Sequence, residues 1–409
     1  SVDIEKQVSY SIRTDFAVVN AVSTNIMKGF TRRGHGLGRK VIDAINTQPG
    51  VNGASAVYKN TLDDSNVTYD FPVEFVCTGT DEKTGIAYAS TENAVFFNLG
   101  DDGNALCNVY GMEEKAVARM DIQEGETDAH TLYEQMSNGE GVLLGVKSDM
   151  GTSVLNPAFD LLDIGDIITV SKNGKRIMEL PVLAKAALNG DDEEIRYTTN
   201  GPFEVGKDGL FLYLPTSIYT EIYDQPVIYK YSFDVEDEHQ AAMSEFLEDY
   251  VENVDPSLNY ISAEDARQDA MTTRTMLQFV GSLIGIIFGA AGVLNLINTI
   301  ITTILARRHE FATMQSIGMT TKQLTRMMIW ESVYYVFGAC IAGLCLSVVL
   351  AFTVVKMLAD GIWYFTFHFT LVPAANACVL LLIVAALVPV AALKRFNKGS
   401  IVEKLRVAD

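Results

Sequence analysis

Few residue patterns in this chain could support catalysis. The glycine-rich segment at 34–40 (GHGLGRK) contains a lysine but lacks the GxxxxGK[ST] spacing of a phosphate-binding loop. His309 and Glu310 open a zinc-protease motif, but position 313 is Thr, so the second histidine ligand is missing. No Ser or Cys lies in a GxSxG nucleophile motif. We therefore predict no catalytic residue, no metal site and no cofactor in this chain.

Two cysteines lie in the polar part of the sequence, Cys77 and Cys107. A disulfide between them is permitted if this part of the chain is outside the cytoplasm. Two free thiols in a large domain are the alternative, because neither cysteine needs a partner.

Charge and hydropathy divide the 409 residues into two parts. Residues 273–409 hold eleven of the 31 Lys and Arg but only five of the 51 Asp and Glu, which gives +6 against −26 for residues 1–272. The net charge of the whole chain, −20, argues against nucleic acid as a partner, since phosphate binding needs a basic surface. We expect residues 1–272 and 273–409 to form separate domains.

Three apolar segments, at about 276–305, 327–358 and 369–393, are long enough to cross a bilayer, which takes about 20 residues. Basic residues gather at 306–326 and after 393, whereas the connection at 359–368 has none. The positive-inside rule then places 306–326 and the C-terminus in the cytoplasm and residues 1–272 outside. The sequence begins at Ser1 without Met or an apolar signal segment, so we expect a membrane span to precede it.

The outer domain is predicted to be α+β. Segments 15–21, 37–45 and 51–58 have the pattern of a β-α-β unit, and 227–233, 238–251 and 258–261 have that of a second one. Between them we expect an inserted β-rich lobe at about 99–202, with strands at 141–146, 167–171 and 176–184 and a hairpin turn at 172–175. A helix capped by Ser262 is expected to continue without a break into the first span.

Gly281, Gly285 and Gly289 recur at four-residue intervals in the first span. Small residues on one face allow two helices to approach closely. The stripe predicts either packing within the same chain or a seam with a second subunit.

The loop between the first two spans has the pattern of a short amphipathic helix. Phe311, Met314 and Ile317 recur at three-residue steps, Gly318 is a helix stop, and Thr320 with Gln323 caps the next helix. The apolar stripe could rest on lipid headgroups or dock on a cytoplasmic partner. In the second case Phe311 would be the main anchor, as aromatic residues often are. Glu310 could pair with the partner or with Arg307.

The segment RRHEFATMQSIGMTTKQLTRMMIWES resembles the signature of FtsX-like permeases, the membrane subunits of the ABC transporter class that includes MacB, LolC/LolE and BceB. Glu310, Phe311 and Gly318 match the E[FI]xxxxxxG pattern of that family, and SIVEKLR at 400–406 resembles its usual C-terminal ending. The resemblance implies four spans, a MacB-like periplasmic core domain with porter-like β-α-β pieces, and a short helix that contacts an ATPase.

The function implied is mechanotransmission. A cytoplasmic ABC ATPase dimer would supply ATP and Mg²⁺ and move the short helix through Glu310, Phe311, Met314, Ile317 and Gly318. The spans, in contact with membrane lipids and with a second permease subunit or half, would relay the movement to the outer domain. Export of peptides, lipoproteins or similar amphiphiles, resistance to antimicrobial peptides and control of a cell-wall hydrolase are not distinguished. A membrane receptor without an ATPase, or a tethered outer-surface enzyme, is the alternative.

Overall fold

The computed structural model describes residues 2–22, 32–80, 85–148, 153–188, 209–360, 362 and 364–396. The chain divides into two compact units, residues 3–271 and residues 272–409 with residues 1–2, which are described separately below. The segment at 400–406 and positions 189–202 of the expected lobe lie outside the described residues.

The first unit is built on one large mixed sheet. Its strands follow the spatial order β14-β1-β13-β2-β7-β12-β9-β11-β10-β3, and β8 pairs with β11 outside this path. The strands are β1 (Phe16–Asn20), β2 (Val51–Lys59), β3 (Val67–Asp70), β7 (Asn108–Met112), β8 (Asp121–Gly125), β9 (Val142–Lys147), β10 (Ile167–Lys172), β11 (Lys175–Leu188), β12 (Phe211–Pro215), β13 (Ile228–Val235) and β14 (Leu258–Ser262). The helices of this unit are α1 (Ile4–Ser11), α2 (Arg39–Asn46), α3 (Glu114–Val117), α4 (Ala129–Ser137), α6 (Thr216–Ile222) and α7 (Gln240–Asp249).

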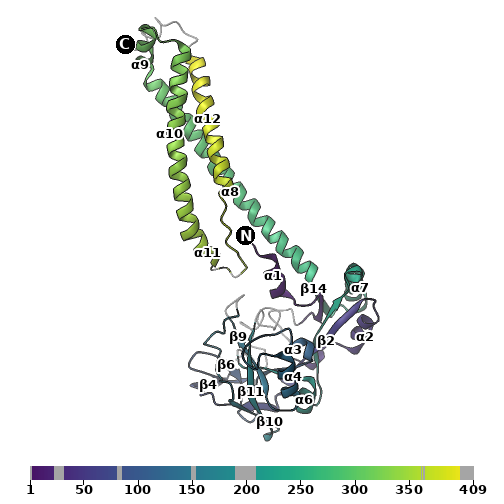
Figure 1. The fold of residues 1–409 in the computed structure, drawn as a ribbon. Helices are drawn as coiled ribbons and strands as arrows, with labels where there is room; N and C mark the ends of the chain where they lie inside the picture. The colour runs from purple at the N-terminus through teal and green to yellow at the C-terminus, as the bar shows by residue number, and fades with distance from the viewer. Residues whose placement is uncertain are drawn as a thin grey trace. The chain divides into compact units, whose positions relative to one another are not determined.

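The two predicted β-α-β units are confirmed, and each is split by a strand of the other. Strand β13 pairs antiparallel with both β1 and β2, so β1-α2-β2 is a parallel unit with β13 inserted. Strand β1 likewise separates β13 from β14 in β13-α7-β14. Val41 and Ile45 of α2 and Leu247 of α7 belong to one buried core with Phe16 and Phe233. Helices α2 and α7 accordingly lie side by side over this part of the sheet (Figure 1).

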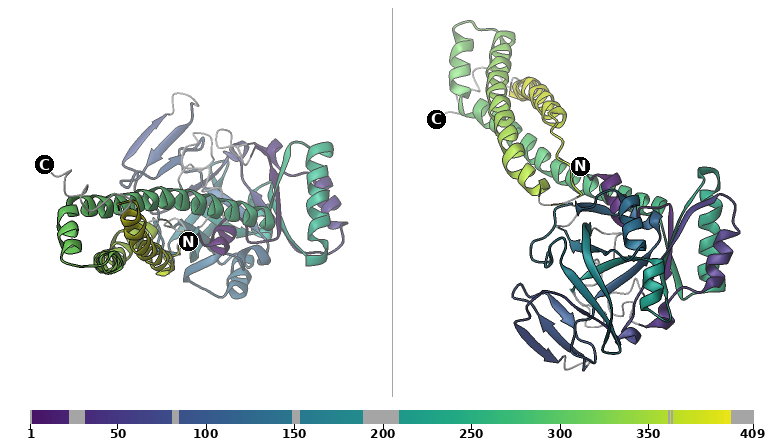
Figure 2. Two further views of the ribbon diagram at one scale, coloured as in Figure 1. Left: turned by 90° about the horizontal axis from the view of Figure 1, so that it is seen from above. Right: turned by 60° about the horizontal axis from the view of Figure 1, so that its bottom comes forward.

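The expected β-rich lobe contributes strands β7 to β11, which extend the same sheet through the pairing of β2 with β7. The predicted hairpin is present, with positive φ at Asn173 (52°) and Gly174 (68°), as a tight two-residue turn requires. A separate three-stranded sheet lies just before this region in the sequence and was not predicted (Figure 2). Its strands are β4 (Cys77–Thr80), β5 (Ala87–Ser90) and β6 (Phe96–Asn98).

The second unit is helical, and three of its helices are long and apolar enough to cross a membrane. Helix α8 (Ala263–Ala306) enters this unit at residue 272, and α10 and α12 pack against each other around Val336, Cys340 and Ala385. The second and third long helices are α10 (Thr321–Leu350) and α12 (Val372–Phe396), and the shorter helices are α9 (Arg308–Ser316) and α11 (Lys356–Asp360).

The predicted unbroken helix after Ser262 is α8, which has 44 residues. The Ser262 hydroxyl accepts a hydrogen bond from the backbone N–H of Asp265 at 3.0 Å, so the expected cap is present. At 1.5 Å per residue, α8 is about 66 Å long. A membrane span uses less than half of that length, and one helix therefore continues beyond the apolar segment.

Candidate functional site

The end of helix α9 and the start of α10 are fixed by the local features that the sequence predicts. Gly318 has φ +109°, and the N–H of Gly318 bonds to the Gln315 carbonyl while that of Met319 bonds to the Met314 carbonyl. This pair of bonds ends the helix in a Schellman motif. The hydroxyl of Thr320 and the side chain of Gln323 then cap each other's backbone N–H groups at the start of α10.

Arg307 fixes the beginning of α9 to the second span. Its Nε donates to Glu310 Oε2 at 2.9 Å, and its Nη1 donates to Glu331 Oε1 at 2.6 Å and Oε2 at 2.9 Å. Glu310 thus pairs within the chain, which was one of its two expected roles. The hydrogen bonds to Glu310 and Glu331 raise the pKa of Arg307, so its guanidinium stays charged. Arg307 and Glu331 are far apart in the sequence, so their ion pair could not be predicted from residue spacing.

Phe311 is buried inside the chain, and its predicted role as the main anchor for an ATPase stays a prediction. Only 3% of the residue is exposed, because its ring packs in a core made by α8, α10 and α12. The Arg307 guanidinium carbon lies 5.3 Å from the ring centre, so a cation-π contact covers it. The residues of this core are Ile300, Ile304, Phe311, Leu324, Met328 and Leu393. Phe311 therefore attaches α9 to all three long helices.

Ile317 has the opposite environment. It is 84% exposed, more than any other large apolar side chain in the described part of the chain. Met314 is half-buried, and Glu310 and Gly318 are exposed. Glu310, Phe311 and Met314 lie on α9, and Ile317 and Gly318 follow it directly. Ile317 is the most exposed large apolar side chain among them. We call Glu310, Met314, Ile317 and Gly318 the α9 surface.

The glycine stripe of α8 faces away from the rest of the chain. A Cβ atom placed on Gly281, Gly285 or Gly289 would meet no described atom within 4 Å. The alternative of close packing within the chain is therefore wrong for the described residues. Asn295 lies further along α8 and is also exposed. An amide side chain in hydrocarbon needs a hydrogen-bonding partner, which favours a protein neighbour on this face.

Cys77 and Cys107 do not form the disulfide that was considered. Both thiols are free: Cys77 is exposed on β4, whereas Cys107 is fully buried in the core of the large sheet. Burial raises the pKa of the Cys107 thiol well above its ordinary value. Cys107 therefore acts as a small apolar side chain.

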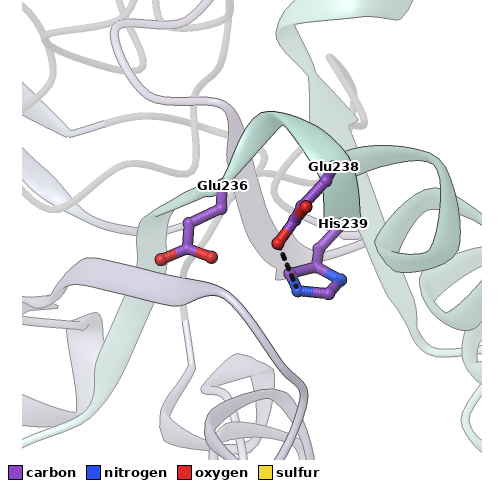
Figure 3. Close-up of side chains that lie close together, drawn as sticks. All are labelled: Glu236, Glu238 and His239. Atoms are coloured by element: carbon purple, nitrogen blue, oxygen red, sulfur yellow. Dashed lines mark ion pairs between the residues drawn. The ribbon is translucent and has the colours of Figure 1, made fainter.

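Glu236, Glu238 and His239 form a cluster on the turn between β13 and α7 (Figure 3). Their ligand-type atoms lie within 4.8 Å of one another, and His239 Nε2 is 3.5 Å from Glu238 Oε1. Both carboxylates are exposed and only the imidazole is half-buried. An ion pair between neighbouring residues accounts for this closeness, and the expectation that the chain holds no metal stays a prediction.

Comparison with known proteins identifies the helical part of the chain. Residues 281–401 match the family model described as FtsX-like permease C-terminal. This part of the chain is an FtsX-like permease domain. The matched residues include α9, Arg307 with its pairs to Glu310 and Glu331, and the glycine stripe of α8. FtsX-like permeases are membrane subunits of ABC transporters and work with a separate ATPase.

Two solved structures are similar to this chain at low identity. The periplasmic region of MacB from Actinobacillus actinomycetemcomitans shares 10% identity, with 65% of this chain and 96% of that chain covered and a TM-score of 0.33. The extracellular domain of the noncanonic ABC-type transporter YknZ from Gram-positive bacteria shares 10% identity, with 60% and 99% covered and a TM-score of 0.30. No curated protein matches the chain.

Proposed function

We propose that this FtsX-like permease transmits ATP-driven movement from a cytoplasmic ATPase dimer to its own outer domain, residues 3–271. The observation that carries the proposal is helix α9, which is locked into the three long helices and exposes Ile317 at its end. A force applied to the α9 surface would reach α8, α10 and α12 through Phe311 and Arg307 without first deforming α9.

Two features support transmission of movement rather than passage of a polar solute through the spans. Glu331, an acidic residue of α10, is already paired with Arg307 and is not available to carry ions. Helix α8 is continuous from residue 263 to residue 306, and its residues belong to both units. ATP and Mg²⁺ would be bound by the ATPase and not by this chain.

The proposed active form contains a second permease subunit or half, packed on the glycine face of α8. Gly281, Gly285 and Gly289 leave space for a neighbouring backbone, and the exposed Asn295 further along α8 offers a hydrogen bond. The basic segment 306–326 would be cytoplasmic and residues 3–271 would lie outside the plasma or inner membrane. Substrates of this kind of transporter would be peptides, lipoproteins or similar amphiphiles.

The test is the Ile317→Asp variant, assayed for ATP hydrolysis with the ATPase that co-purifies from the native membrane. Burial of one isoleucine side chain stabilises an interface by roughly 1.5–3 kcal/mol, so the variant should weaken the complex by about tenfold or more. Regulated ATP hydrolysis should be lost with it.

The matched control is Ile177→Asp, the same change at an exposed isoleucine of β11. It should leave the complex and its ATPase activity unchanged. Equal activity of the Ile317→Asp variant and the wild type would contradict the proposal.

A further inference from the structure

A basic pocket lies between the cytoplasmic ends of α10 and α12. It has a volume of about 450 Å³. Its residues are Thr321, Lys322, Thr325, Arg326, Ile329, Val390, Leu393 and Lys394. We call these eight residues the α10/α12 pocket.

The three cations of the pocket, Lys322, Arg326 and Lys394, have no ion-pair partner among the described residues. Glu310 and Glu331 pair with Arg307 instead. Three positive charges around one cavity attract an anion, and the Thr321 hydroxyl can add a hydrogen bond to its oxygens, whereas the Thr325 hydroxyl donates to the Thr321 carbonyl at 2.8 Å.

The other wall of the pocket is apolar. Ile329 and Val390 are half-buried and Leu393 is buried. Ile329 and Val390 lie about one helical turn from the nearest basic residue, and Leu393 is next to Lys394. A small hydrophilic anion would leave this wall in contact with water. An amphiphile with an anionic phosphate head and an acyl chain would cover both walls.

We propose that the α10/α12 pocket binds the headgroup of an anionic phospholipid from the cytoplasmic leaflet. The basic residues lie at the ends of two membrane-spanning helices, at the level where lipid phosphates are found. Lys322 and Arg326 are four residues apart on one face of α10 and can contact the same phosphate. The bound lipid would fasten α10 to α12 beside α9, independently of whether an ATPase contacts the α9 surface.

The test uses the purified full chain in neutral detergent, titrated with dioleoylphosphatidylglycerol or dioleoylphosphatidylcholine, with bound lipid counted by native mass spectrometry. The wild type should bind phosphatidylglycerol more tightly than phosphatidylcholine. The Lys322→Gln/Arg326→Gln variant should lose this preference, with phosphatidylglycerol affinity about tenfold lower. Equal binding of both lipids by the wild type would overturn the proposal.

The matched control is Arg274→Gln/Lys356→Gln, which removes the same charge from exposed positions outside the pocket. It should keep the lipid preference, and both variants should melt like the wild type. Loss of the preference in the control as well would show a general charge effect and overturn the site.

Two further arms separate the sources of the anion. Inorganic phosphate at millimolar concentration should not displace the lipid; displacement by it would show a free-phosphate site and overturn the proposal. If the Lys322→Gln/Arg326→Gln variant keeps the lipid preference but loses the ATPase, the pocket binds an acidic protein surface and the lipid proposal is wrong.

Discussion

Phe311 and Ile317 lie at opposite ends of the α9 segment and have opposite environments. Phe311 is 3% exposed and Ile317 is 84% exposed. The periodicity that groups them on one helical face cannot tell which apolar side chain the protein itself buries, because that depends on the distant residues Leu324 and Leu393. Removing each side chain should therefore have a different consequence.

We predict that Phe311→Ala destabilises the helical unit by about 3–5 kcal/mol, the usual cost of deleting a buried aromatic ring. Thermal unfolding in detergent would measure this change. Phe288→Ala, the same substitution at a position of α8 that is 74% exposed, is the matched control and should change stability little. Similar melting of the two variants would show that Phe311 is not part of the core.

His130 gives a pH-dependent prediction in the outer domain. Its Nδ1 lies 2.7 Å from Glu114 Oε1, and this hydrogen bond, with the charge of Glu114, raises the pKa of His130 above 6.5. A raised folded-state pKa stabilises the fold below the unfolded value, and the contribution disappears as pH rises through the folded value. The His130→Gln variant should melt below the wild type at pH 5.5 and together with it at pH 8.5. The same difference in melting temperature at both pH values would contradict a stabilising contact between His130 and Glu114.

At the scale of elements, the turns, caps and helix ends that depend on neighbouring residues could be predicted from the sequence. The hairpin at Asn173–Gly174, the Ser262 cap and the end of α9 at Gly318 depend on residues close to one another in the chain, and all three were predicted. The three-stranded sheet was missed because its strands are three or four residues long and include Gly79, which weakens the strand pattern.

The next prediction concerns the association of helix α8 with a second subunit. Gly285→Leu places a large side chain on the face proposed to meet a second subunit, and over-packing there should cost about 1–3 kcal/mol of association energy. The monomer should keep its melting temperature, since no described atom lies within 4 Å of that position. Analytical ultracentrifugation in detergent would measure the loss of self-association or of the partner permease.

The control for Gly285→Leu is Gly343→Leu, the same change on α10 where a Cβ also meets no described atom within 4 Å. It should associate like the wild type. Equal association of both variants would mean that the glycine stripe of α8 faces lipid.

At the scale of the whole molecule, the charge division between 1–272 and 273–409 indicates a two-part chain with three spans. The β-α-β units were also foreseeable, because each has a strand-helix-strand pattern within about 45 residues. Their interleaving was not, since the pairing of Phe16 with Phe233 joins strands from opposite ends of the outer domain. The α10/α12 pocket was missed for the same reason, because its basic residues come from two helices.

The proposed topology places residues 3–271 outside and α9 in the cytoplasm. With the exposed Cys77 and Cys345 changed to Ser, a cysteine introduced at the exposed Ser217 should react with an impermeant thiol reagent in intact cells. A cysteine introduced at the exposed Thr313 should react only after the membrane is permeabilised. The reverse labelling pattern would overturn the orientation.

The central claim is that the α9 surface contacts a cytoplasmic ATPase. The most direct measurement replaces Ile317 with the photo-crosslinker p-benzoylphenylalanine and irradiates native membranes with and without ATP. We predict an adduct with an ABC ATPase, identified by mass spectrometry, whose yield changes with ATP and which is absent when the crosslinker replaces Ile177. Adducts with lipid alone, or the same protein adduct from both positions, would contradict the account.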